Sequence, residues 1–140
     1  MKQVVKQAAV IAAYLFIVWG LCAQVHTAGS ADIVVLMDTS GTILPYYHAI
    51  NDQVLHSIIT RFVKKGDTFH LLSFSAEPCY EMSQTINTEA DLSRVVSRFM
   101  LLYQLGNSAD FLAGLHFTAA YMKTLPPQRS KTVIVISDGI

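Results

Sequence analysis

The sequence predicts an α/β domain built on a doubly wound, mostly parallel open sheet, and three observations lead to this prediction. Residues 33–37 and 133–136 are apolar runs with no polar position, as expected of strands that are buried on both faces. Segments with the apolar spacing of amphipathic helices lie between the candidate strands. Strands that alternate with helices imply right-handed crossover connections, and therefore helices on both faces of the sheet.

Composition narrows the class of protein further. The 140 residues are 52% apolar and 14% charged, and ten Lys and Arg balance ten Asp and Glu. This length suits one domain with a substantial core and is too short for two. Because basic and acidic residues are equal in number, the chain lacks the excess positive charge expected of a nucleic-acid-binding protein. The high apolar content argues against intrinsic disorder.

The amino-terminal region has the features of an export signal. Residues 8–23 carry no charge and follow Lys2 and Lys6, which is the basic lead and apolar core of such a signal. A helix over this run spans about 24 Å, less than the roughly 30 Å of a bilayer core. We therefore expect residues 1–23 to be a cleaved signal peptide, with a signal anchor through residues 4–23 as the alternative. The exported chain would be periplasmic, secreted, or held at the cell surface.

The globular domain is expected over residues 32–140, after a polar linker at 24–31. Its first strand, 33–37, ends at Asp38. Apolar residues spaced as one face of a helix extend from Ile50 to Val63, with a start near Pro45 and a stop at Lys64-Lys65-Gly66. The segment from Thr68 to Ser75 then has the apolar content of a second strand.

The second half of the domain repeats this alternation. Thr88 or Asp91 suits the start of a helix, and Pro126 suits the end of another. The elements expected here are an edge strand at 80–86, helices at 92–99 and 111–122, and a strand at 132–136 that runs into Ser137-Asp138-Gly139.

Two of the apolar strands are followed by an aspartate, Asp38 after the first and Asp138 after the last. Because neighbouring parallel strands end at the same edge of a sheet, these carboxylates should lie close together. Ser40 and Thr42 alternate with Asp38, and Gly41 allows the loop to turn tightly. Carboxylate and hydroxyl oxygens suit a hard divalent cation such as Mg²⁺, so the sequence predicts a metal site at this edge. A simpler interpretation is a turn with a helix N-cap, in which each polar atom satisfies local backbone.

At these residues the chain resembles a von Willebrand factor type A (VWA) domain. The loop from Asp38 to Thr42 is similar to the Asp-x-Ser-x-Ser metal-ion-dependent adhesion site of that family, with Thr42 in the last place. Residues 65–75 and 133–139 resemble the family's second-strand and fourth-strand regions. The resemblance implies a Rossmann-like sheet, and it covers the N-terminal two-thirds of such a domain. The domain is therefore expected to be truncated after its fourth strand and incomplete at the C-terminus.

One expected ligand departs from the family pattern. The family places a threonine five residues ahead of a Gly-Leu pair, and the matching position here is Ala109. Ser108 and Asp110 are the further candidate ligands in this loop. The resemblance implies Mg²⁺, with Mn²⁺ or Ca²⁺ as alternatives, bound weakly because Ala109 offers no oxygen. Tyr46 and Tyr47 follow the first loop, and are candidates for a ligand-binding rim.

The predicted function is an exported protein-binding module, for adhesion, interaction or assembly, that uses a divalent cation and catalyses no reaction. Its protein ligand is not specified by the sequence. One alternative is a VWA-like scaffold that binds partners without metal. A less favoured alternative is a haloacid-dehalogenase-like phosphatase with Asp38 as nucleophile. Ser40 stands where such an enzyme carries a proton-transferring aspartate, and a serine hydroxyl has no suitable pKa for that task.

Overall fold

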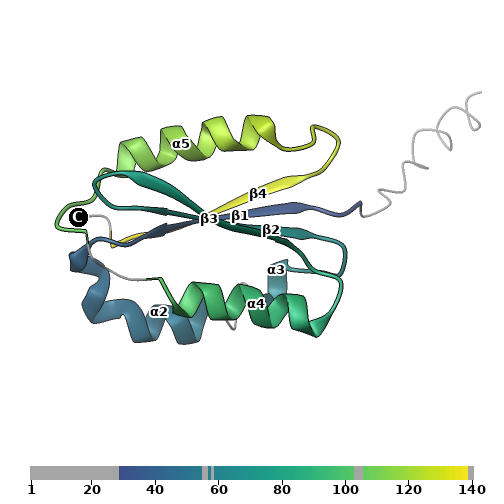
Figure 1. The fold of residues 1–140 in the computed structure, drawn as a ribbon, viewed down its shortest axis with the longest axis horizontal. Helices are drawn as coiled ribbons and strands as arrows, with labels where there is room; N and C mark the ends of the chain where they lie inside the picture. Colours follow the sequence, from purple (N-terminus) through teal and green to yellow (C-terminus); the bar gives the residue numbers. More distant parts are fainter. Residues whose placement is uncertain (1–28, 55–56, 58, 103–105, 139–140) are drawn as a thin grey trace, which may run out of the picture.

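The fold is an open four-stranded sheet with helices on both faces (Figure 1). The computed structural model describes residues 29–54, 57, 59–102 and 106–138. The strand order is β3-β2-β1-β4. β1 pairs in parallel with both β2 and β4, and β3 pairs antiparallel with β2. The strands are β1 (Asp32–Asp38), β2 (Thr68–Phe74), β3 (Pro78–Thr85) and β4 (Lys131–Ile136). The expected doubly wound, mostly parallel sheet is confirmed.

Helices form one layer on each side of this sheet. The helix α5 covers one face, while α2, α3 and α4 lie on the other (Figure 1). No helix in the described part of the chain has both the length and the apolar character needed to cross a membrane. The predicted signal segment lies outside the described residues. The helical elements are η1 (Gly41–Tyr46), α2 (Tyr47–Val54), α3 (Thr60–Phe62), α4 (Glu89–Met100) and α5 (Phe111–Thr124).

The central strand β1 divides the core into two halves. Its alternate side chains Ile33, Val35 and Met37 pack with the residues of α4 and β2, while Val34 and Leu36 pack under α5. All five are at most 2% exposed. The expectation that an uninterrupted apolar run is covered on both faces is confirmed for this strand.

The same expectation is wrong for β4 within the described residues. Val133 and Val135 are 38% and 41% exposed. They lie on the α5 face of the sheet, because Val133 is the register partner of Val34. The helix α5 packs over β1, β2 and β3, so it leaves this edge strand uncovered. An apolar pattern alone did not distinguish the central strand from the edge.

The predicted helix over 111–122 is present, but only some of its apolar residues, such as Leu115 and Met122, pack against the sheet. Phe111 and Leu112 are 45% and 62% exposed, whereas Gly114 and Thr118 are buried. A Cβ atom at position 114 would lie 2.9 Å from the Phe74 ring. The small residues Gly114 and Thr118 face the sheet, because a larger side chain there would prevent the close approach of α5 to β2.

The first predicted helix is observed as two segments, α2 and α3, with residues 55, 56 and 58 outside the described residues. α2 begins at Tyr47, because the residues around Pro45 form the 3-10 helix η1 instead. Phe62, assigned to the apolar face of this helix, is 49% exposed. The start of α4 is confirmed, since Thr88 and Asp91 cap it together.

Candidate metal site at the rim of the sheet

The loop that follows β1 is held against two neighbouring segments. The backbone N and Oγ1 of Thr39 both donate to the carbonyl of Phe74, at 2.8 and 3.0 Å. The backbone N of Gly41 donates to the carbonyl of Gly106 at 2.6 Å, and Ser40 and Gly106 form an isolated parallel bridge. The loop is therefore anchored to the end of β2 and to the segment that leads into α5. We call this end of the sheet the rim.

Within the loop, two side-chain hydroxyl groups lie next to each other, and one carboxylate accepts a hydrogen bond from the backbone. The backbone N of Ser40 donates to Asp38 Oδ1 at 2.8 Å, and Ser40 Oγ lies 2.9 Å from Thr42 Oγ1. Ser40 occupies the N-cap position of η1, yet its side chain makes no capping hydrogen bond. The simple turn-and-cap interpretation therefore does not account for the Ser40 hydroxyl, which is in a side chain only 1% exposed.

The end of β4 completes the arrangement. Ser137 Oγ donates to Asp38 Oδ2 at 2.9 Å. Asp138 follows directly and lines a pocket of about 360 Å³ with Ser137, Tyr46 and two isoleucines. The topology thus brings the segments of Asp38 and Asp138 to one rim, as the sequence predicted. The sequence analysis placed Ser137 between the last strand and Asp138, where the family commonly carries a threonine, but assigned it no role in the site.

The two candidate rim tyrosines differ in their surroundings. Tyr46 is 56% exposed beside the pocket. The hydroxyl of Tyr47 donates toward the carbonyls of Phe99, Met100 and Leu102 at 3.0 to 3.3 Å. Tyr47 therefore ties the start of α2 to the end of α4, whereas Tyr46 is available at the surface.

The loop before α5 offers three different environments. Asp110 Oδ1 accepts from the backbone N of Ala113 at 2.8 Å, so it caps α5. Ala109 packs against the core beneath α5. Ser108 is exposed, and its loop begins at Gly106, which is bonded to the loop of Ser40.

The residues at the rim fit a hard divalent cation. Carboxylate and hydroxyl oxygens are the donors that Mg²⁺ and Ca²⁺ prefer. Within the described ranges, no three His, Cys, Asp or Glu side chains form a metal-binding group, so a cation here would need the hydroxyl oxygens. Asp38 is 0% exposed, and none of the ion pairs found in the described residues includes it. Each of its oxygens has lone pairs beyond the bond that it already accepts.

The chain belongs to the von Willebrand factor type A domain family, whose model matches residues 33–140. A comparison with curated proteins gives no match. This match confirms the resemblance that the sequence predicted from the Asp38–Thr42 loop together with residues 65–75 and 133–139.

Solved structures share the fold at low sequence identity. Proximal thread matrix protein 1 from the mussel byssus is 22% identical with a TM-score of 0.62, over 80% of this chain and 31% of that chain. A structure of that mussel protein with a zinc-occupied MIDAS motif gives 21% and 0.61, over 80% and 29%. The pilus adhesin SpaC from Lactobacillus rhamnosus GG, in its open conformation, gives 17% and 0.64, over 82% and 15%. The chain thus spans less than a third of the length of these proteins.

Proposed function

We propose that this protein is an exported, metal-assisted protein-binding module of the adhesion or assembly type. The observation that carries the proposal is the pair formed by Ser40 and Thr42, whose hydroxyl oxygens lie 2.9 Å apart beside Asp38. Ser40 leaves its helix uncapped. A buried hydroxyl that does not serve the backbone is better explained by a ligand at the rim than by a turn.

Each rim residue has a separate role in this proposal. Asp38 and Asp138 supply the negative charge. Ser40 and Thr42 supply neutral oxygen ligands, so the cation is coordinated without further carboxylates. The cation, Mg²⁺ or alternatively Mn²⁺ or Ca²⁺, would provide an electrophilic centre for an oxygen atom of the partner protein. Ser137 orients the carboxylate of Asp38 through its hydrogen bond. Ser108 and Asp110 are further candidate ligands, of which Asp110 also caps α5.

Export is proposed on the sequence of the first 23 residues, with 24–31 as the linker and 32–140 as the VWA domain. The mussel matrix protein and the pilus adhesin among the similar structures support a role outside the cytoplasm. The exposed Tyr46 beside the pocket supports contact with a protein ligand at the rim, because tyrosine is enriched at such interfaces.

A metal-independent module is the second candidate, and one observation favours it. Ala109 stands where the family carries a threonine ligand, and it packs into the core beneath α5. A partner would then bind the same rim through hydrogen bonds alone. The phosphatase alternative has less support, because Asp38 is fully buried and accepts hydrogen bonds from Ser40 and Ser137.

A thermal melt with and without millimolar Mg²⁺ tests the proposal. Mg²⁺ should stabilise the chain by about 1 kcal/mol, or a few degrees, because it binds the folded state alone. Asp38→Asn should abolish this shift, whereas Asp52→Asn, which changes an exposed aspartate of α2, should leave it intact. Ala109→Thr should increase the shift. Absence of a shift in both the native and the Ala109→Thr protein would contradict the metal site and favour the metal-independent module.

A further inference from the structure

The end of the sheet opposite the rim carries a distinct distribution of charge. We call it the base and define its basic surface by five residues: Lys64, Lys65, Lys123, Arg129 and Lys131. These include every lysine in the described part of the chain. Lys64 and Lys65 precede β2, Lys131 begins β4, and Lys123 lies in the last turn of α5. The other basic residues in the described part of the chain are Arg61 of α3 and Arg94 and Arg98 of α4.

The acidic side chains of the base do not cancel this charge. Asp32 and Asp67 are only 1% and 5% exposed. Asp32 is paired with Arg129, and Asp67 accepts from the backbone N atoms of Ala31 and Lys64, at 2.7 and 2.8 Å. Glu89, at the start of α4, is an exposed carboxylate at this end. In contrast, Lys64, Lys65 and Lys123 are exposed, and no ion pair found in the described residues includes them.

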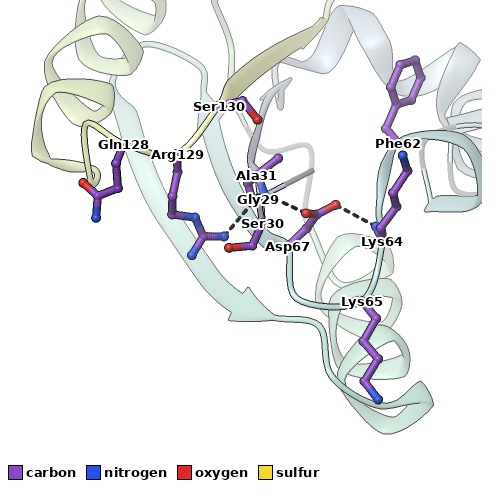
Figure 2. A pocket seen from close by; sticks show the side chains of 10 residues that line it. All are labelled: Gly29, Ser30, Ala31, Phe62, Lys64, Lys65, Asp67, Gln128, Arg129 and Ser130. Atoms are coloured by element: carbon purple, nitrogen blue, oxygen red, sulfur yellow. Dashed lines mark hydrogen bonds between the residues drawn. The ribbon is translucent and has the colours of Figure 1, made fainter. Parts of the chain in front are cut away.

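The basic side chains of the base do not converge on one point. A pocket of about 660 Å³ lies at the base. Figure 2 shows that Lys65 points away from this pocket while Lys64 extends beside Phe62. The guanidinium of Arg129 is already engaged by Asp32 and by the carbonyl of Ala31, at 3.0 and 2.7 Å. A single small anion would need donors that meet at one place. A dispersed set of lysines around an exposed aromatic ring instead suits an extended, negatively charged surface.

The path of the chain identifies that surface. Gly29 lines the basal pocket, and only residues 24–28 separate it from the apolar run that ends at position 23. Five extended residues reach at most about 18 Å. In the uncleaved chain, insertion of the apolar run in a bilayer therefore keeps the base within about 18 Å of the lipid headgroups. This distance is about two Debye lengths.

We propose that the basic surface of the base docks on an anionic lipid membrane and thereby directs the rim away from it. The lipid headgroup phosphates are the partner, and the exposed Phe62 ring lies at the depth of the headgroups. The proposal does not depend on whether the rim binds a metal. In the signal-anchor form of the chain, it adds to the apolar run a second, electrostatic contact that orients the domain.

The test measures partition of the full chain onto vesicles of phosphatidylcholine alone and of phosphatidylcholine with about one third phosphatidylglycerol. Insertion of the apolar run contributes to both, so the ratio of the two partition coefficients reports the charge-dependent part. Each lysine near such a surface contributes about fivefold. Lys64→Gln/Lys65→Gln should therefore lower the ratio about 25-fold. For the unaltered chain, 0.5 M salt should also lower the ratio, because the Debye length is then only about 4 Å.

Two controls separate the base from other charges. Arg98→Gln, on a side chain in the last turn of α4 that is 43% exposed, should change the ratio less than about twofold, because that end of α4 contacts Tyr47 on the rim side of the sheet. Lys2→Gln/Lys6→Gln measures the contribution of the leader. If this leader variant removes the whole preference for anionic vesicles while Lys64→Gln/Lys65→Gln retains it, the proposal is overturned.

A second measurement needs no variant. Acetylation of the unaltered chain, followed by mass spectrometry, should show Lys64 and Lys65 protected on anionic vesicles and modified on phosphatidylcholine vesicles. Equal modification on both kinds of vesicle would contradict docking of the base, however the variants behave.

Discussion

The two ends of the strand β1 carry aspartates that are equally buried but have different partners for their negative charge. Asp32 at the base and Asp38 at the rim are 1% and 0% exposed. Asp32 Oδ1 lies 3.0 Å from Arg129 Nε and 3.5 Å from His70 Nε2. Asp38 accepts instead from the backbone N of Ser40 and the hydroxyl of Ser137, at 2.8 and 2.9 Å. One carboxylate has a basic partner within the protein, and the other has neutral donors.

This difference separates a charge that is compensated within the protein from one that accepts only neutral hydrogen-bond donors. A buried carboxylate is costly unless a cation compensates its charge. At the base that cation is Arg129, so Asp32 joins β1 to the segment before β4. At the rim the hydrogen bonds orient Asp38 without neutralising it. The comparison thus supports the proposal that the missing positive charge is an external divalent cation.

The largest expected effect follows from breaking the pair at the base. Arg129→Met removes the guanidinium that pairs with Asp32 and leaves that carboxylate buried, so it should lower the free energy of unfolding by about 3–5 kcal/mol. Urea unfolding monitored by circular dichroism measures it. Asp32→Asn/Arg129→Met removes both charges and should recover much of the loss. In metal-free buffer, Asp38→Asn should change stability by less than about 1 kcal/mol, because it removes a charge that pairs with no basic side chain among the described residues. A loss as large as that of Arg129→Met would contradict the comparison.

An intermediate effect is expected from acid. Burial lowers the pKa of His70 below its ordinary value of 6.5, against the opposing effect of Asp32. The unfolded chain therefore binds more protons than the folded one as pH falls below about 6.5, so stability should fall there and be restored above it. The slope for one group is at most about 1.4 kcal/mol per pH unit.

Unfolding free energies measured between pH 8 and 5 check this dependence. His70 faces Asp32, Arg129 and the hydroxyl of Tyr121, and His70→Gln should flatten the curve. His116→Gln, which alters an exposed histidine of α5, should leave it unchanged. A curve that is equally steep in the His70 variant would assign the effect to another group.

The smallest effect concerns two residues at N-cap positions. Thr88 caps α4 through Asp91 in a reciprocal pair of hydrogen bonds, so Thr88→Ala should cost about 1 kcal/mol. Ser40 makes no such bond, so Ser40→Ala should cost less than about 0.5 kcal/mol in metal-free buffer and yet reduce the Mg²⁺-dependent shift in melting temperature. Thermal melts of the two variants with and without Mg²⁺ measure both quantities. Equal costs without metal would mean that Ser40 acts as an ordinary cap.

Much of the fold was predictable because the spacing of apolar residues in a strongly periodic segment indicates which of its side chains are buried. The uninterrupted run before Asp38 specified a central strand, and the Asp38–Thr42 loop indicated the family and the rim. The predictions failed where burial depends on neighbours that are distant in sequence. Val133 belongs to an apolar run like that of β1, yet it lies at an edge that α5 does not cover.

The sequence by itself determined the alternation of strands and helices, the family, and the residue types at the rim. The tertiary structure alone decided which face of α5 is buried, since Gly114 faces Phe74 while Phe111 is 45% exposed. It also decided that Asp32 meets Arg129, 97 positions along the chain, and that Ser137 meets Asp38. The physical reason is that local periodicity is set by backbone geometry within a few residues. The compensation of a buried charge depends instead on partners that only the packed sheet brings together.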